Sequence, residues 1–319
     1  MRNRRLLLGA GTCYAIATLI LAVGLGELAF HPLRVPLDAR TSAEAMTTRF
    51  GAVLEDASAT ASDGARLQAW YARPAKPNGN AVILIHGIGD NRQGMMGFAE
   101  LFLSQGYAVL VPDSRAQGTS GGGFPTYGVE ESKDIRDWFN WLEIRQHPSC
   151  VFGMGESMGA AIVLQAVKTT PFCAVVAESP FASFRQISYI RVGQIFHSGE
   201  WLGQYALRPS VELAFIYARL IHGVNLTSAS PERSVVGSKV PILLIHRLAD
   251  DNIPPHQSEM IPTTIQPTSR CGRCPTLATA VRSVLVRKSS IAGCSGGSPD
   301  IPWEPEYEQH FYSGRRDVS

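Results

Sequence analysis

The chain has 319 residues, of which 45% are apolar and 18% are charged. This composition is typical of a globular protein and excludes a disordered one. The length suits one large α/β domain or two small ones. Lys and Arg together exceed Asp and Glu by only two, which argues against a basic face for nucleic acid.

The N-terminus predicts a membrane anchor at residues 1–28. The arginine-rich MRNRR precedes an uncharged apolar run from Leu6 to Gly26. A helix of this length, at about 1.5 Å per residue, spans about 30 Å, the thickness of a bilayer core. A cleaved signal peptide is the alternative, but its apolar region is shorter, about 7–15 residues. The flanking arginines argue against a buried soluble helix. The positive-inside rule then predicts a single-pass protein with the rest of the chain on the non-cytoplasmic side.

After a linker-like stretch at 32–40, the chain predicts strands that alternate with helices. Apolar and polar residues alternate within 50–74 on both sides of the turn Asp63-Gly64, which predicts a β-hairpin. Apolar runs predict strands at 80–87, 108–113, 150–156, 173–179 and 240–246, and helical spacing predicts helices at 97–107, 130–147 and 157–170. Such alternation implies an α/β fold with a mostly parallel central sheet and helices on both faces.

Residues 180–239 change to an aromatic, helix-like pattern. An insertion at this point would lie over the carboxyl ends of the strands, where ligands bind in open α/β sheets. We therefore expect a small helical lid there.

The cysteines indicate no metal site. Cys13 lies in the predicted anchor, while Cys150 and Cys173 flank apolar strands and are expected to be packed core residues. The sequence CGRC at 271–274 has zinc-knuckle spacing, but only Cys294 follows and no histidine pair completes a site.

A candidate nucleophile lies between a predicted strand and a predicted helix. Residues 155–159 match G-x-S-x-G, in which the glycines permit a sharp turn that exposes Ser157. The start of the new helix favours developing negative charge there. The alternative is a simple strand-to-helix turn, which this context disfavours.

Two backbone N–H groups are candidates for an oxyanion hole. The loop after His86-Gly87 can direct the N–H of Ile88 toward the same point as the N–H of Met158. We expect His86 itself to hold this loop rather than to act in catalysis.

The sequence VPILLIHRLADDNIPPHQ predicts a buried strand followed by a turn with two acidic residues. A serine nucleophile needs a base, and the base needs a carboxylate that orients it. Asp250 is the preferred acid because it follows the strand-ending His246 by four residues, and Asp251 is the solvated alternative.

The segments LIHGIGDNRQG, GYAVLVPDSRAQGTSGG, GMGESMGAA and ILLIHRLADDNIPP together resemble the alpha/beta-hydrolase superfamily. They are most similar to its membrane-anchored bacterial esterase-like or serine-aminopeptidase-like members. The resemblance covers about residues 81–257. It implies Ser157 as the nucleophile, Asp250 as the triad acid, and Ile88 and Met158 as oxyanion donors.

Two positions within the resembling region differ from the family pattern or lie near a further acidic position of the family. Arg247 stands where the family usually has glycine. Glu178 lies near a secondary acid position, where we expect a structural contact.

The third member of the triad is the main departure from the family pattern. In this family the histidine follows the acid, in a loop after the last strand. Only His256 and His310 follow Asp250. His256 is six residues after the acid and is expected to face solvent, so elimination leaves His310. The tail at 262–319 no longer resembles the family, which is typical of a diverged ending or of a disrupted reading frame.

These patterns predict a hydrolase domain at 29–261 that cleaves a small-molecule ester, thioester or amide through an acyl-serine intermediate, without a cofactor. Two alternatives remain open: a membrane-tethered protein of this fold without activity, and acyl transfer to an acceptor other than water. The apolar, aromatic insertion suggests an apolar acyl or leaving group. The absence of an H-x-x-E-H sequence disfavours a metal hydrolase.

Overall fold

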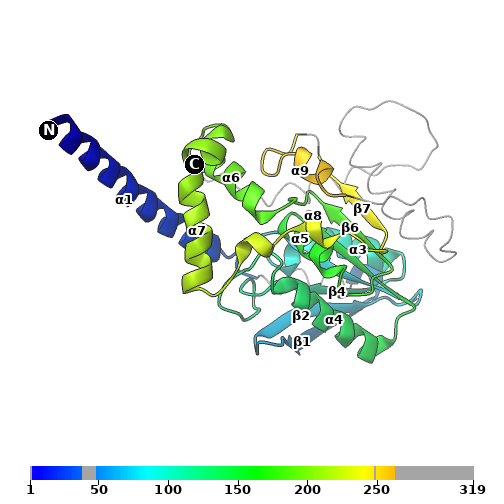
Figure 1. The fold of residues 1–319 in the computed structure, drawn as a ribbon. Coiled ribbons are helices and arrows are strands. Elements are labelled where there is room, and N and C mark those ends of the chain that lie inside the picture. The colour runs from blue at the N-terminus through cyan, green and yellow to red at the C-terminus, as the bar shows by residue number, and fades with distance from the viewer. Residues whose placement is uncertain (1, 38–47, 248, 263–319) are drawn as a thin grey trace, which may run out of the picture. The chain divides into compact units, whose positions relative to one another are not determined.

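A computed structural model describes residues 2–37, 48–247 and 249–262 (Figure 1). Its described part contains one sheet of seven strands. The strands are β1 (Val53–Thr60), β2 (Arg66–Arg73), β3 (Asn80–Ile85), β4 (Ala108–Pro112), β5 (Cys150–Glu156), β6 (Ala174–Glu178) and β7 (Ile242–Ile245). The strands expected from the apolar runs are all confirmed.

The strands lie in the order β1-β2-β4-β3-β5-β6-β7 across the sheet. β1 and β2 form the expected antiparallel hairpin, in which Thr60 pairs with Arg66. β2 is also antiparallel to β4, whereas all other neighbouring strands run parallel. The parallel strands β3 and β4 are almost wholly buried, as expected for strands covered on both faces. The prediction of a mostly parallel sheet is confirmed.

Three helices connect the parallel strands: α3 (Met96–Ser104), α4 (Glu131–Gln146) and α5 (Met158–Ala166). The chain moves one way along the sheet from β3 to β4 and the other way from β4 through β5 to β6. Because such crossovers are right-handed, α3 lies on one face and α4 and α5 lie on the other. Every residue of α5 is buried, since its sequence is apolar on nearly all sides.

Residues 180–239, called the helical insertion below, are helical as expected. They contain α6 (Phe184–Ile195), a π-helix (Leu202–Ala206), α7 (Arg208–Ile221), a 3-10 helix (Leu226–Ser228) and α8 (Pro231–Ser234). The side-chain amide of Gln194 in α6 donates to the backbone carbonyls of Asp251, at 2.7 Å, and Asn252, at 3.2 Å. The insertion therefore borders the acidic turn after β7.

The predicted anchor forms one helix, α1 (Arg2–Phe30). Residues 5–30 of it are long and apolar enough to cross a membrane, with a mean hydropathy of 2.1. The core helix of a soluble protein or a signal sequence can also reach this length and hydropathy. The last turns of α1 contact α7 of the insertion (Figure 1). Residues 31–37 have no regular structure, and the rest of the expected linker, 38–40, lies outside the described residues.

The disulfide between Cys150 and Cys173 was not anticipated. Cys150 is buried in the core, as expected, whereas Cys173 is only partly buried, and the two form a disulfide with their Cα atoms 5.7 Å apart. Cys150 begins β5, and Cys173 lies just before the neighbouring parallel strand β6. The N–H of Cys173 donates to the carbonyl of Val151 at 2.9 Å, which places the two side chains within bonding distance.

Several predictions fall outside the described residues. These concern the candidate base His310, the zinc-like spacing at 271–274, and Cys294. The predicted tail domain at 262–319 also lies outside them except for Pro262.

Candidate active site

Ser157 lies in a sharp turn between β5 and α5. Its backbone has φ 56° and ψ −116°, and such conformations cost a non-glycine residue about 1–3 kcal/mol. A Cβ atom on Gly155 would stand 2.2 Å from the backbone carbon of Gly159. A Cβ atom on Gly159 would stand 2.1 Å from the carbonyl oxygen of Ile85. The packing therefore requires both glycines and holds the serine in its strained conformation.

The ends of three strands meet around Ser157. Its N–H donates to the carbonyl of Glu178, the last residue of β6, at 2.8 Å. A Cβ atom on Gly87, just after β3, would stand 3.4 Å from the Cβ of Ser157. The backbone of Glu178 thus makes the structural contact expected at this position. Strain of this kind is concentrated at functional sites, which favours a nucleophile over a simple turn.

Both predicted oxyanion donors belong to segments that border Ser157. Met158 is the first residue of α5, where backbone N–H groups have no acceptor within the helix. Ile88 follows Gly87 in the loop after β3. The convergence of these two N–H groups on one reacting oxygen stays a prediction.

Gln117 connects the two segments that carry these donors, a role the sequence analysis missed. Its side-chain carbonyl accepts a hydrogen bond from the N–H of Gly89 at 2.8 Å. Its side-chain amide lies 3.9 Å from the sulfur of Met158, within range of a weak hydrogen bond. Gln117 is fully buried. No local sequence pattern indicated where this side chain would point.

His86 is structural, as expected. Its Nε2 accepts a hydrogen bond from the N–H of Ser114 at 3.0 Å, so Nδ1 carries the proton and donates to the carbonyl of Gly87 at 2.8 Å. Burial lowers the pKa of His86 and keeps the ring neutral. Both ring nitrogens are engaged with the backbone, and the ring is not placed to act as a base.

A buried ion pair fixes the far end of the same loop. The N–H and guanidinium of Arg92 each donate to the carboxylate of Asp113 at 2.8 Å. Burial by itself raises the pKa of Asp113, but the hydrogen bond and charge of Arg92 outweigh it, so that the pKa is lowered. The loop that carries Ile88 is therefore held at Gly89 and again at Arg92.

Asp250 lies in the turn after β7 at the same edge of the sheet as Ser157. Its Oδ1 accepts hydrogen bonds from the N–H groups of Asn252 and Ile253, both at 3.0 Å. Burial by itself raises the pKa of Asp250, but these bonds and one from the Ser179 side chain outweigh it and lower the pKa. The carboxylate is thus buried, ionised and fixed, whereas the alternative Asp251 is exposed.

Two further residues near the acidic turn were not anticipated. Ser179 lies just after β6 and has φ 50°. Its side chain donates a hydrogen bond to Asp250 and so links the end of β6 to the acidic turn. Arg191 of α6 is half-buried, and burial lowers the pKa of its guanidinium although the charge of Asp250 opposes this. The guanidinium donates to the side-chain oxygens of Gln194, at 2.9 Å, and Asn252, at 3.3 Å.

Within the described residues, no hydrogen bond joins a histidine to Ser157. The Nε2 of His246 donates to the carbonyl of Ile253 at 2.7 Å and lies 3.7 Å from the carboxylate of Asp250. His256 is exposed, as expected. It lines a pocket of about 320 Å³ between α6, the π-helix and α9 (His256–Glu259). His310 lies outside the described residues.

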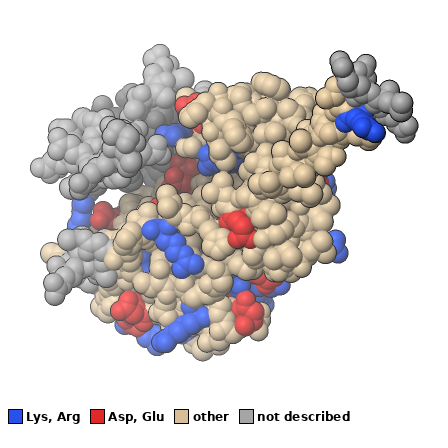
Figure 2. Space-filling view, turned by 90° about the vertical axis from the view of Figure 1, so that its left-hand side faces the viewer, with Lys and Arg blue, Asp and Glu red and all other residues tan. Residues whose placement is uncertain are grey.

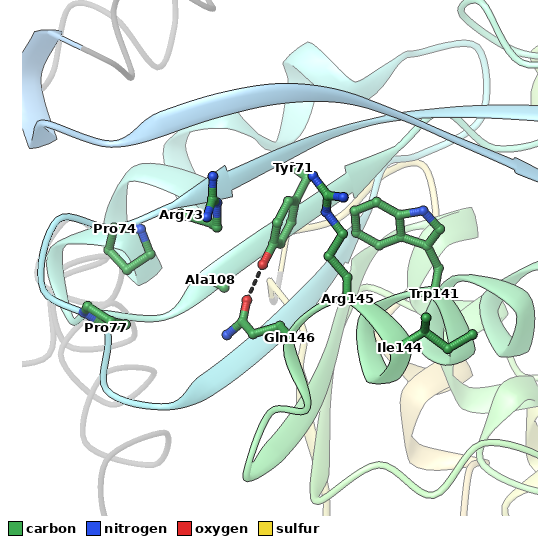
Figure 3. A pocket seen from close by; sticks show the side chains of 9 residues that line it. All are labelled: Tyr71, Arg73, Pro74, Pro77, Ala108, Trp141, Ile144, Arg145 and Gln146. Atoms are coloured by element: carbon green, nitrogen blue, oxygen red, sulfur yellow. Dashed lines mark hydrogen bonds between the residues drawn. The ribbon is translucent and has the colours of Figure 1, made fainter.

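A larger pocket, of about 700 Å³, lies away from this chemistry (Figure 3). It is lined by Tyr71, Arg73, Pro74, Pro77, Ala108, Trp141, Ile144, Arg145 and Gln146. Ala108 begins β4, so the pocket lies at the edge of the sheet opposite Ser157. Its two arginines are ion-paired with Glu55, and Tyr71 is hydrogen-bonded to Gln146. It holds no nucleophile paired with a base.

No metal centre is formed by the residues that the structure describes: no three His, Cys, Asp or Glu side chains there are arranged to hold an ion.

Comparison with known sequences matches residues 76–213 to a family model described as serine aminopeptidase, S33. The match includes Ser157 and ends before Asp250. The chain is 28% identical over 188 residues to the uncharacterised protein YqkD of Bacillus subtilis, covering 57% of this chain and 59% of that protein. It is 27% identical over 126 residues to a lysophosphatidylserine lipase of Bos taurus, covering 37% and 31%. The matched region thus spans three fifths or less of each relative.

Among solved structures, an esterase of Pyrococcus furiosus has a TM-score of 0.56 with 22% sequence identity. The superposition covers 72% of this chain and 82% of the esterase. At this level of identity the likeness shows a shared fold.

Proposed function

Because this chain belongs to the alpha/beta-hydrolase superfamily, we propose that it is a serine hydrolase with Ser157 as its nucleophile. The observation that carries the proposal is the strained turn at Ser157, with φ 56°, at the start of a fully buried helix. A turn of this kind presents the hydroxyl at the edge of the sheet where Asp250 also lies. The matched family and the esterase neighbour support a serine-hydrolase type of activity in general.

In the proposed reaction, Ser157 Oγ attacks the carbonyl carbon of the substrate while a base takes its proton. The tetrahedral oxygen accepts hydrogen bonds from the N–H groups of Ile88 and Met158. Collapse breaks the bond to the leaving group, which receives the proton from the base and leaves an acyl-serine. Water, activated by the same base, then hydrolyses this ester and releases the acid.

Asp250 is the proposed acid and His310 the proposed base. The lowered pKa of Asp250 supports this role, because an ionised carboxylate orients an imidazole and stabilises its charged form. The described part of the chain supplies no histidine bonded to Ser157, so the residues after Pro262 would have to bring His310 beside Asp250.

The proposed substrate is a small-molecule ester, with a thioester or an amide as further candidates. One relative is named as a lysophosphatidylserine lipase and one structural neighbour as an esterase. These names favour an ester. The helical insertion, which borders the acidic turn, is the proposed lid.

We place the hydrolase domain on the non-cytoplasmic side of a membrane, with α1 as its anchor. The disulfide between Cys150 and Cys173 supports this location, because disulfides persist in oxidising compartments and are rare in the cytosol. Release of the protein from membranes by a carbonate wash, or a mature N-terminus near Ala29, would contradict the anchor.

A serine-directed fluorophosphonate probe tests the nucleophile. The parent chain is expected to be labelled and the Ser157→Ala variant not, whereas the Ser104→Ala variant, changed at an exposed helix end, is labelled like the parent. A folded parent that takes no label would contradict the proposal and favour a protein of this fold without activity.

A further inference from the structure

Exposed apolar side chains gather on the helical insertion. Eight of the exposed large hydrophobic residues lie there: Ile195, Phe196, Trp201, Tyr205, Ile216, Leu220, Ile221 and Val236. The rest of the described hydrolase domain, residues 48–179 and 240–262, has only Val53, Ile144 and Met260. Large exposed apolar patches mark surfaces that contact a partner or a membrane.

Helix α7 of the insertion is fixed against the end of α1. The ring of Tyr217 lies so close to Gly26 that a Cβ atom there would stand 2.7 Å from it. The hydroxyl of Tyr217 donates to the carboxylate of Glu27 at 2.5 Å. The same oxygen of Glu27 lies 2.9 Å from Nε2 of His222, whose ring packs on Phe30. These contacts set the orientation of α7 relative to α1.

The exposed apolar residues of α7 surround this contact. Ile216 precedes Tyr217, and Leu220 and Ile221 follow it by three and four residues, which places them around the same side of the helix. Ile216 is 53% exposed, Leu220 75% and Ile221 65%. These three residues are called the α7 patch below. In Figure 2, the broad surface at the upper right that is not covered by grey atoms is mostly tan, whereas many of the visible charged side chains lie lower.

The α7 patch lies at the depth where α1 would leave a bilayer. The uncharged run of α1 ends at Gly26, and Glu27 is the first charged residue after it. Tyr217 touches both residues, so the patch lies level with the polar boundary of the membrane. Exposed Trp201, just before the adjoining π-helix, and Tyr205 within it are residue types enriched at that boundary.

We propose that the α7 patch rests in the interface of the lipid bilayer that holds α1. The proposal rests on the membrane anchor proposed above. A soluble partner that covered the patch would have to enter the headgroup region beside α1, whereas the lipid is already there. Amphipathic helices that lie on membranes bury their apolar face about 5–10 Å into this region.

The test uses the full chain in phosphatidylcholine vesicles, with and without phosphatidylcholine spin-labelled on its acyl chains. The four cysteines outside the Cys150–Cys173 disulfide, Cys13, Cys271, Cys274 and Cys294, are replaced by serine. A single cysteine is then introduced and labelled with the fluorophore NBD. Leu220→Cys reports on the patch, and Leu19→Cys reports on the anchor. Ile144→Cys is the matched control, because Ile144 is a 79% exposed apolar residue on α4.

The spin-labelled lipid is expected to quench the label at position 220 and at position 19, but not at position 144. Quenching at 19 without quenching at 220 overturns the proposal while the anchor stands, and disulfide cross-linking between unlabelled Leu220→Cys copies would then identify a second chain as the partner. No quenching at either position overturns the anchor and the proposal together. Labelling by the fluorophosphonate probe, measured separately, reports on the hydrolase function alone.

Discussion

The side-chain carbonyl of Gln117 accepts a hydrogen bond from the N–H of Gly89 at 2.8 Å. Gln117 follows β4 and Gly89 follows β3, so the bond joins two loops at the carboxyl edge of the sheet. The other end of the same amide faces the sulfur of Met158. One buried side chain thus holds the two segments from which the proposed oxyanion donors come.

We expect Gln117→Leu to lower kcat about tenfold with KM nearly unchanged. Loss of an oxyanion-hole donor itself costs about 10²–10³ in rate, and the effect is smaller here because Gln117 only positions the donors. Steady-state kinetics on a short-chain ester, with thermal unfolding as a check on folding, measures this. Gln105→Leu, a change at an exposed glutamine, is the control. Equal losses in both variants, or a change in KM alone, would contradict a positioning role.

Gly155→Ala is expected to destabilise the protein by about 3 kcal/mol, the upper end of the cost of overpacking. The new methyl group would meet the backbone of Gly159, which cannot rotate away. Thermal unfolding in detergent measures the loss. Gly123→Ala is the control, because nothing lies within 4 Å of its added carbon. Similar unfolding temperatures for the two variants would argue against the tight turn.

Asp250→Asn is expected to reduce kcat/KM for ester hydrolysis by about 10⁴, as loss of the triad carboxylate does elsewhere. Asp251→Asn should stay close to the parent, because Asp251 is exposed. Both variants are compared with Ser157→Ala in the same assay. A larger loss of activity in Asp251→Asn than in Asp250→Asn would show that Asp251, and not Asp250, is the triad acid.

His310→Ala is expected to lose as much activity as Ser157→Ala, because members of a triad act as a unit. His256→Ala serves as the control, since His256 is exposed and is the only other histidine after Asp250. A His310→Ala variant that keeps the rate of the parent would exclude His310 as the base.

The ion pair between Arg92 and Asp113 predicts a pH dependence of stability. Asp113→Asn should lower the free energy of unfolding at pH 7 by about 3–5 kcal/mol, because it leaves a buried guanidinium without its partner. The pKa of Asp113 is lowered from 3.8 by folding. Its stabilisation is therefore full above pH 3.8 and is lost as the pH falls through the lower pKa of the folded state.

Denaturant unfolding of parent and Asp113→Asn across this acid range measures the effect. The difference between them is expected to be constant near neutral pH and to shrink below pH 3.8. A difference that persists undiminished in acid would show that the carboxylate charge is not its source.

Much of the fold was predictable because it depends on neighbours in sequence. The hairpin at Asp63-Gly64, the buried strands and the turn at Ser157 follow from alternation, apolar runs and glycine spacing, which act over a few residues. The preference for Asp250 over Asp251 came from position in the turn and stays a prediction; the structure adds that Asp250 is buried and Asp251 exposed.

The sequence by itself determined the order of elements, the superfamily resemblance and the candidate nucleophile. Only the tertiary structure decided that Cys150 bonds to Cys173, that Gln117 joins Gly89 to Met158, and that Tyr217 packs on Gly26. These pairs are 23 to 191 residues apart. Such contacts form where strands and helices from distant parts of the chain pack together, and no local spacing encodes which side chains then meet.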